Sequence, residues 1–279
     1  MSQVLLDVLR KATGYLQAHG SDSPRLDAEL LMAHALGLGR LELYLQFERQ
    51  LTDADLQPYR ELVARRARGE PVAYLVGHKE FMKLDFEVTS EVLVPNPDTE
   101  ALVLRAIEWC RARGAPAQVA DVGTGSGCIA IALAHYVPDA VVCASDDSAA
   151  ALGVAARNVR RHDLEGRVRL CQGDLLEPMP EGLDLVCANL PYVAPEASLP
   201  PEVLAQPGHA LRAPEGGTAL VRRLLADAPR KLAEDGSVLV EIDTAQRDTF
   251  EAELAAYAGH RLHKDLGGRI RVLEAWRQA

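Results

Sequence analysis

Hydrophobic residues in the first part of the chain, residues 1–76, have the spacing of helices. Apolar positions three or four apart recur in 4–9, 26–31 and 56–63, and runs of β-branched residues are few. This is the pattern of amphipathic helices that share a core. A Ser-Pro pair at 23–24 suits the start of the second helix, because Pro is favoured in the first turn behind a capping residue. The pattern predicts a small helical domain over 1–76.

Between Glu80 and Pro95 the pattern changes to alternation. Hydrophobic residues stand at positions 81, 84, 86 and 88, then at 92 and 94, with polar residues between them. Such alternation is typical of a short β-hairpin, and we expect a linking hairpin over 77–95 that serves as a hinge between domains. Beyond it, Asp98 or Thr99 can cap a helix that runs over 101–111.

The remaining chain, 96–279, alternates short apolar β-branched runs with helical stretches such as 129–134 and 149–161. Near-continuous apolar strands are expected when helices cover both faces of a parallel sheet. The fold class is therefore α/β, with a doubly wound, mainly parallel sheet. The tail adds two runs joined through Gly267-Gly268, which suit an antiparallel hairpin at the sheet edge. The seven strand candidates are 118–123, 140–146, 168–174, 183–189, 237–243, 260–266 and 269–276.

Composition narrows the functional classes. The formal net charge is −10, which disfavours stable binding of nucleic acid through phosphates because that mode needs a basic face. The five cysteines lie far apart, without a Cys-x-x-Cys or Cys/His pattern, so we expect no metal and a reducing compartment. The N-terminal stretch does not have the pattern of a signal peptide, and no apolar run reaches the ~18 residues of a membrane span. A cytoplasmic monomer without membrane contact is predicted.

A glycine loop, Asp121-Val122-Gly123-Thr124-Gly125-Ser126-Gly127, follows the first strand of the expected sheet. Glycines at a strand-to-helix turn allow positive φ and close approach of a ligand. Asp146 ends the next strand 19 positions after Gly127, a spacing at which a carboxylate meets a ribose diol. A tight turn that binds nothing and a nicotinamide site are the alternatives. The spacing G-x-G-x-G and the acid at 121, which would repel pyrophosphate and attract an ammonium group, favour S-adenosylmethionine.

Two further segments complete the predicted site. Asp174 and Leu175, after the third strand, are placed to bound an adenine, although a strand-end Asp can also simply cap its own loop. The fourth strand ends in Asn189-Leu190-Pro191-Tyr192, a form found in methyltransferases that act on planar NH2 groups. The lone pair of such a nitrogen is delocalised, so it is a poor nucleophile. The Asn189 side-chain oxygen and the Leu190 carbonyl are expected to accept its two N–H groups, with the Tyr192 ring against its flat face.

With these motifs in order, the sequence resembles the HemK/PrmC family, protein-glutamine methyltransferases that modify the Gly-Gly-Gln motif of peptide chain release factors. The resemblance implies a class I methyltransferase domain, an N-terminal domain that grips the release factor, and a glutamine clamp at 189–192. Cofactor contacts are implied for Gly123 to Gly127 with Asp146, Leu175 and Asn189, and Pro97 joins the predicted substrate-binding residues. The matching blocks are 69–77, 80–86, 92–100, 121–132, 189–193 and 265–273.

Three positions depart from the family pattern, and other functions stay open. Asn96 stands where the family usually has Arg, Leu190 replaces the first Pro of Asn-Pro-Pro-Tyr, and Leu175 stands where an aromatic residue is common. Asn-Leu-Pro-Tyr is also typical of ribosomal RNA adenine dimethylases, so methylation of an RNA adenine amino group is one alternative. Methylation of a ribosomal protein glutamine is a second, and a binding role without catalysis is a third.

The remaining polar candidates are interpreted as structural. His135, His162 and His209 have no partner at catalytic spacing in the sequence, so we expect them in the core. Cys128 is interpreted as a small packing residue. The segment 195–217, rich in Pro and Gly, is expected to form a loop beside the acceptor pocket.

Overall fold

The computed structural model describes residues 3–277 and divides the chain into two compact units. The first comprises Met1–His78 with Leu199–Gln206, and the second comprises Lys79–Ser198 with Pro207–Ala279. The segment Leu199–Gln206 therefore belongs with the helical N-terminal part, although the domain bounds drawn from the sequence place it in the last domain. The local pattern of hydrophobic residues does not indicate that this segment belongs with the N-terminal part.

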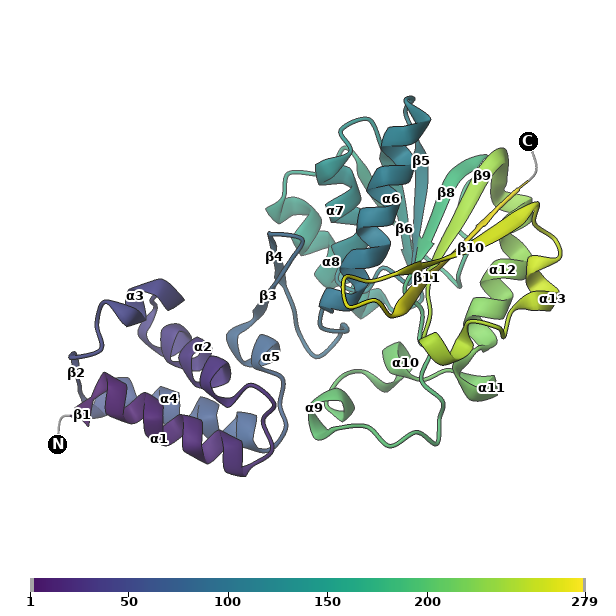
Figure 1. Cartoon of the computed structure of the whole chain (residues 1–279). Coiled ribbons are helices and arrows are strands. Elements are labelled where there is room, and N and C mark those ends of the chain that lie inside the picture. The colour runs from purple at the N-terminus through teal and green to yellow at the C-terminus, as the bar shows by residue number, and fades with distance from the viewer. Residues whose placement is uncertain (1–2, 278–279) are drawn as a thin grey trace. The chain divides into compact units, whose positions relative to one another are not determined.

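The first unit is helical. Its core contains Leu5, Leu31, Leu56 and Tyr59, all nearly inaccessible to solvent. Gly37, with φ of 63°, ends the second helix in the left-handed conformation, which glycine adopts at low cost. Its helices α1 (Leu5–Ala18), α2 (Pro24–Leu36), α3 (Arg40–Tyr44), α4 (Asp53–Ala67) and α5 (Val72–Val76) are purple to blue in Figure 1. The later segment adds α9 (Pro201–Leu204), drawn in green, and a short ladder joins β1 (Gln3–Val4) to β2 (Gln50–Leu51).

A buried arginine attaches the later segment to this unit. The Arg66 side chain is only 6% exposed, and it donates to Asp27 at 2.7 Å and to Glu202 at 2.6 Å. A buried guanidinium requires such partners, because an unpaired charge away from water is strongly unfavourable. Gly69 lies against Pro201, where a Cβ would come within 2.7 Å of the proline side chain. Contacts between residues far apart in the sequence thus define this unit.

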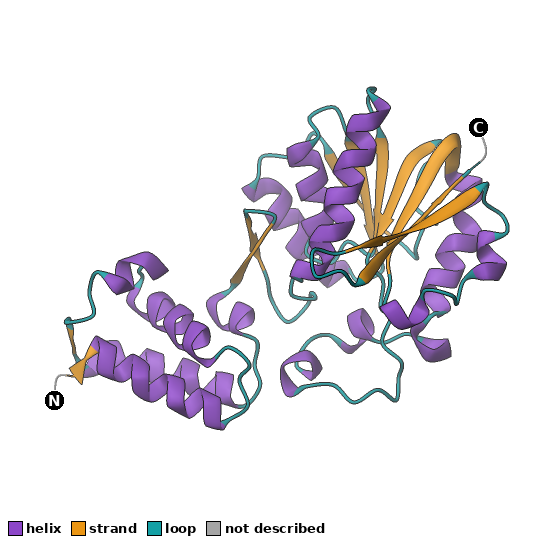
Figure 2. Cartoon of the chain, viewed as in Figure 1, coloured by secondary structure: helices purple, strands orange, loops and turns teal. Residues whose placement is uncertain are grey.

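The second unit contains a seven-stranded sheet in the order β10-β11-β9-β8-β5-β6-β7. The pairs among β9, β8, β5, β6 and β7 are parallel, as the sequence predicts. Their carboxyl ends therefore meet at one edge, where open α/β sheets bind ligands. The strands, orange in Figure 2, are β5 (Gln118–Val122), β6 (Val141–Asp146), β7 (Val168–Gln172), β8 (Leu183–Ala188), β9 (Leu232–Glu241), β10 (Gly259–Lys264) and β11 (Ile270–Trp276).

Helices cover both faces of this sheet (Figures 1 and 2). Successive strand residues belong to two separate cores: Val119 and Leu185 to one, Ala120 and Val186 to the other. This is the period-two alternation of a strand buried on both sides. One core is shared with α6 (Glu100–Arg113), α7 (Cys128–Tyr136) and α8 (Ala149–Arg161), the other with α12 (Ala219–Lys231) and α13 (Glu251–Leu254), and shorter turns are η1 (Pro97–Thr99), α10 (Gly208–Leu211), α11 (Pro214–Gly217) and η2 (Thr244–Gln246).

Two hairpins complete the unit. The linking hairpin pairs β3 (His78–Phe81) with β4 (Leu84–Glu87), and Met82 and Lys83 turn between them with φ of 51° and 59°. It is shorter than the pattern predicts, since residues 91–95 form no strand and instead line a cleft. The tail hairpin is antiparallel as expected, but β11 lies beside β9, which leaves β10 at the sheet edge.

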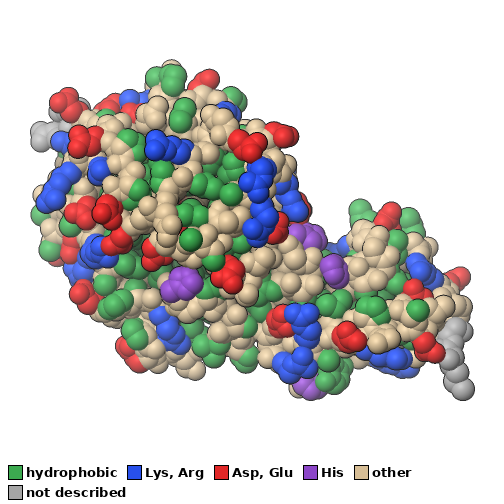
Figure 3. Space-filling model, turned by 180° about the vertical axis from the view of Figure 1, so that it is seen from behind, with side chains coloured by type: hydrophobic (Ala, Val, Ile, Leu, Met, Phe, Trp, Pro, Cys, Tyr) green, Lys and Arg blue, Asp and Glu red, His purple; other side chains and the backbone are tan. Residues whose placement is uncertain are grey.

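The surface charge, the cysteines and any candidate membrane or metal sites bear on what the composition predicts. On the face shown in Figure 3, Lys and Arg side chains are interspersed with Asp and Glu, without a broad basic field. All five cysteines are free thiols. Within residues 3–277, no helix is both long and apolar enough to cross a membrane, and no group of His, Cys, Asp and Glu is arranged to hold a metal ion.

Candidate active site

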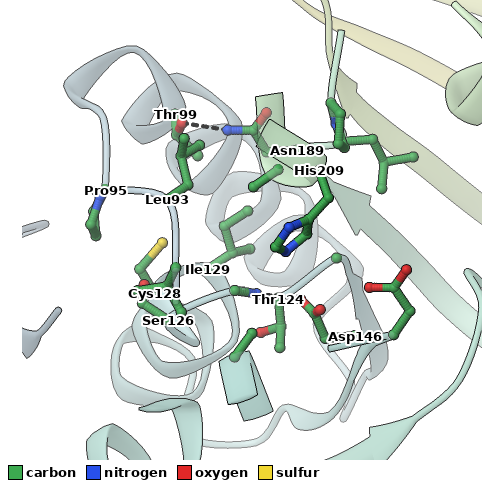
Figure 4. A pocket seen from close by; sticks show the side chains of 18 of the residues that line it. Leu93, Pro95, Thr99, Thr124, Ser126, Cys128, Ile129, Asp146, Asn189 and His209 are labelled. Atoms are coloured by element: carbon green, nitrogen blue, oxygen red, sulfur yellow. Dashed lines mark hydrogen bonds between the residues drawn. The ribbon is translucent and has the colours of Figure 1, made fainter. Parts of the chain in front are cut away.

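A cleft opens at the carboxyl ends of β5, β6, β7 and β8 (Figure 4). Counted with its open mouth it encloses about 960 Å³, a size typical of sites for small organic ligands. Of the residues predicted for the site, the cleft wall contains Gly123, Thr124, Gly125, Ser126, Asp146, Asp174, Leu175, Asn189, Leu190 and Pro191. Residues from four separate strand ends thus meet around one hollow.

The glycine loop forms the floor of this cleft. Gly123, Gly125 and Gly127 have φ of 73°, 54° and 84°, conformations that residues with a Cβ rarely adopt. The N–H groups of Gly123 and Thr124 donate to the Ser145 carbonyl at 2.9 and 2.8 Å, which fixes the loop to β6. A Cβ at position 123 would lie 3.0 Å from the Leu190 side chain. Glycine is therefore required at 123 both for φ and for the approach of the acceptor motif.

Asp146 joins the loop to the end of β6. Its carboxylate accepts from the Gly125 N–H at 2.8 Å and from the Ser148 N–H at 3.0 Å, and the side chain lines the cleft. Burial, the largest influence, raises the pKa of this carboxyl above its usual value. Each carboxylate oxygen has two lone pairs, so both can still accept from hydroxyl groups in the cleft.

Asp121 lies beneath the loop, outside the cleft wall. Its side chain is fully buried, and its Oδ2 accepts from the Thr124 hydroxyl at 2.6 Å and from the Ala130 N–H at 3.1 Å. Its Oδ1 has no hydrogen-bond partner among the described residues. The direct attraction for a ligand ammonium that the sequence suggests would require exposure to the cleft, which this burial does not provide. Its bonds instead tie the loop to the first turn of α7.

The pKa of Asp121 leads to a prediction for stability. Burial raises this pKa to about 7, against roughly 3.9 in an unfolded chain. Between these two pKa values Asp121 keeps its proton in the folded protein but has lost it in the unfolded chain. Its effect on the free energy of unfolding is therefore absent below about pH 4 and becomes steadily more destabilising as pH rises to about 7. We expect the stability of Asp121→Asn relative to wild type to rise by about 4 kcal/mol between pH 4 and pH 8 in urea unfolding. A difference that does not change with pH would contradict this.

Asp174 and Leu175 follow β7 and form another part of the wall. Leu175 has φ of 47°, unusual for a residue with a side chain, and its carbonyl accepts from the Ser145 hydroxyl at 2.9 Å. Its side chain is buried. Asp174 is exposed and paired with Arg223. An apolar surface and a carboxylate are thus adjacent at the cleft.

The acceptor motif is divided by the structure. Asn189, Leu190 and Pro191 line the cleft, whereas Tyr192 and Pro97 lie outside its wall, as does Gly127 of the loop. The Asn189 side-chain nitrogen donates to the Thr99 hydroxyl at 2.9 Å (Figure 4). Within residues 3–277 its amide oxygen accepts no hydrogen bond. That oxygen is available to a ligand N–H.

Comparison with known sequences agrees with this geometry. The family described as "PrmC N-terminal domain" matches residues 7–77, and the family described as "Methyltransferase small domain" matches residues 101–256. Two curated relatives are both called release factor glutamine methyltransferase. The protein from Rhodopirellula baltica is 39% identical, over 96% of this chain and 95% of its own, and that from Moorella thermoacetica is 40% identical, over 98% and 99%. The chain belongs to the release factor glutamine methyltransferase family. The resemblance drawn from the motifs is confirmed.

Solved structures show the same fold. A ribosomal protein L11 methylase from Lactobacillus delbrueckii is 27% identical with a TM-score of 0.50, over 69% of this chain and 84% of that one. A methyltransferase from Pyrococcus furiosus is 18% identical with a TM-score of 0.54, over 77% and 99%. The predicted class I methyltransferase fold is confirmed by these neighbours and by the sheet order.

The cleft also contains residues that the sequence did not mark. Thr99 and His209 line it, and His209 faces the cleft near Asp146 in Figure 4. The interpretation of the histidines as core residues is wrong, because His135 and His209 are exposed and His162 is half-buried. They lie at or near the ends of α7, α8 and α10, where local patterning says little about exposure. Cys128 lines the wall as well, and burial raises the pKa of its thiol to about 12.

Proposed function

We propose that this protein transfers a methyl group to the side-chain amide nitrogen of a glutamine in a peptide chain release factor, in the Gly-Gly-Gln motif. The observation that supports it most is the hydrogen bond from Asn189 to Thr99, which leaves an amide oxygen at the cleft free to accept an N–H group. The near full-length similarity to release factor glutamine methyltransferases supports the choice of acceptor. A neutral NH2 group matches an amide oxygen better than a hydroxyl or carboxylate acceptor would.

The methyl donor is S-adenosylmethionine, which supplies an electrophilic methyl group on a sulfonium. The residues of the cleft fit it. Asp146 presents carboxylate oxygens for a ribose diol, and Gly123 and Gly125 let a ligand approach the backbone closely. Leu175 offers an apolar surface for adenine, with Asp174 beside it. Asp121 contributes indirectly by holding the loop.

The acceptor amide is held by the end of β8. Asn189 Oδ1 and the Leu190 carbonyl accept its two N–H groups, and the Tyr192 ring bounds its flat face. In the reaction the glutamine nitrogen forms a bond to the methyl carbon as the sulfur–carbon bond breaks, and one amide proton leaves to solvent. Fixing the nitrogen in line with the methyl group provides most of the acceleration, since orientation alone can contribute several kcal/mol.

Two other acceptors correspond to the alternatives above. One structural neighbour is a ribosomal protein L11 methylase, and this makes a ribosomal protein the second candidate acceptor. Methylation of RNA is disfavoured by the net charge of −10, because phosphate binding needs a basic face. The proposal places the protein in the cytoplasm with a release factor as its partner, and the monomeric state remains a prediction.

A transfer assay separates these acceptors. We expect label from methyl-labelled S-adenosylmethionine to enter an intact release factor and not one whose Gly-Gly-Gln glutamine is replaced by glutamate. Ribosomal RNA and ribosomal protein L11 should stay unlabelled under the same conditions. Label in RNA or in L11 alone would refute the proposed acceptor.

A further inference from the structure

The carboxylate of Glu241 is buried beside the acceptor motif and is used by no step described above. Glu241 ends β9, the strand beside β8, and its side chain is 1% exposed. Within residues 3–277, neither carboxylate oxygen has a hydrogen bond of good geometry. Native proteins rarely leave a buried carboxylate in this condition, so such a group calls for a functional explanation.

The groups nearest Glu241 belong to the acceptor site. Burial, the largest influence, raises the pKa of its carboxyl to about 7, and the hydroxyls of Thr99 and Tyr192 are near enough to lower it, although neither forms a hydrogen bond of good geometry with it. Arg271 also lowers it and Asp98 raises it, and these two residues pair with each other at 2.7 Å. The pairing of β8 with β9, which sets Ala188 beside Val240, brings this carboxylate next to the start of the acceptor motif and near two hydroxyl groups.

Thr99 connects this carboxylate to Asn189. Its hydroxyl oxygen accepts from the Asn189 amide at 2.9 Å, and its side chain is 2% exposed. Thr99 occupies the N-cap position of α6, yet its side chain makes no capping bond. The hydroxyl proton therefore has no assigned acceptor among the described residues, and Glu241 is the acceptor that burial and proximity leave for it.

The direction of these bonds decides which way the Asn189 amide points. A hydroxyl whose proton is taken by Glu241 can only accept from a second neighbour. It then selects the NH2 end of Asn189 and leaves the oxygen for the ligand. Without the carboxylate, the same hydroxyl can donate to the Asn189 oxygen. The rotated Asn189 amide would then present its N–H groups to the NH2 group of the substrate glutamine.

We propose that Glu241 is a positioning residue for the methyl transfer, which orients the Asn189 amide through the Thr99 hydroxyl and holds the Tyr192 phenol. The inference rests on the proposed function, in which Asn189 accepts a hydrogen bond from the substrate amide. It adds two residues, Thr99 and Glu241, to the acceptor site, and neither is expected to touch the transferred methyl group.

Steady-state kinetics at pH 8 with a release factor test this. Thr99→Val and Glu241→Met, which keep volume and remove the polar group, are each expected to lower kcat by about 10- to 100-fold. The dissociation constant for S-adenosylmethionine should stay within about threefold, because Thr99→Val keeps the shape of the cleft wall and Glu241 lies outside that wall. Thr99→Ser should restore kcat to within about threefold of wild type, since it keeps the hydroxyl. Unchanged kcat in Thr99→Val or Glu241→Met would overturn the inference.

The double variant decides whether Glu241 acts through Thr99. Thr99→Val with Glu241→Met should lose no more than the worse single variant, because both break one chain of bonds. If the losses of kcat in the two single variants multiply in the double variant, Glu241 does not act through Thr99. Glu274→Met is the matched control, at a buried glutamate of β11 paired with Arg105 and His263. It should lower thermal stability without changing kcat, and a comparable loss of kcat there would mean that any buried glutamate of the sheet has this effect.

A measurement without turnover separates this inference from the proposed function. The Asn189 side-chain NH2 signals in NMR spectra, assigned by their loss in Asn189→Ala, should exchange slowly with water in wild type and faster in Thr99→Val and Glu241→Met. If wild type methylates no release factor but this pattern holds, the proposed function fails and the orienting network stands. If wild type is active and the exchange rates do not differ, the network is refuted.

Discussion

Asn189→Ala is expected to lower kcat for glutamine methylation by about 1,000-fold, to near the background rate. The substitution removes the oxygen that accepts from the substrate amide, and loss of one such preorganised group costs about 10²–10³ in rate. Affinity for S-adenosylmethionine should stay within a few-fold, because Asn189 is one of many residues that line the cleft. Single-turnover transfer to a release factor and calorimetric cofactor binding would measure the two effects.

The control for this variant is its own stability. Asn189 makes one side-chain hydrogen bond, to Thr99, so Asn189→Ala should lower the free energy of unfolding by only about 1 kcal/mol. Asn189→Asp tests the direction of the bond, because it keeps an oxygen but cannot donate to Thr99. We expect it to be less active than wild type, because the bond to Thr99 is lost, but more active than Asn189→Ala, because an oxygen remains to accept from the substrate amide. Failure of Asn189→Ala to fold would show that Asn189 is structural.

Asp146→Ala is expected to weaken binding of S-adenosylmethionine by roughly 100-fold, corresponding to about 2–3 kcal/mol for charge-assisted hydrogen bonds. The variant removes the acceptor for a ribose diol and frees the Gly125 N–H that the carboxylate now holds at 2.8 Å. At saturating cofactor, kcat should recover to within about tenfold, since the acceptor motif is untouched.

Asp139→Ala is the matched control for this second variant. It makes the same change of charge in an exposed residue before β6, at the other end of the strand from Asp146. Its cofactor affinity should equal that of wild type. Equal weakening in both variants would mean that net charge, and not the position of Asp146, governs binding. Wild-type affinity in Asp146→Ala would remove this residue from the proposed cofactor site.

Much of the fold and part of the candidate site can be predicted from local sequence. Short, near-continuous apolar runs separated by helical stretches predict the parallel strands, since burial on both faces leaves no polar face. The glycines at 123, 125 and 127 were recognisable because their φ values exclude most other residues. The gathering of Asp146 and Asn189 at one cleft follows from the strands being parallel, which brings their carboxyl ends to the same edge.

Other features depend on contacts between distant parts of the chain, which no local pattern records. The sequence by itself determined the helical and α/β parts, the glycine loop and the acceptor motif, because each is specified by neighbouring residues. Only the tertiary structure placed Asp121 beneath its loop, brought Thr99 within 2.9 Å of Asn189 and buried Glu241 beside the acceptor motif. Burial and hydrogen-bond direction arise from packing between separate elements, and they decide which way a side-chain amide points.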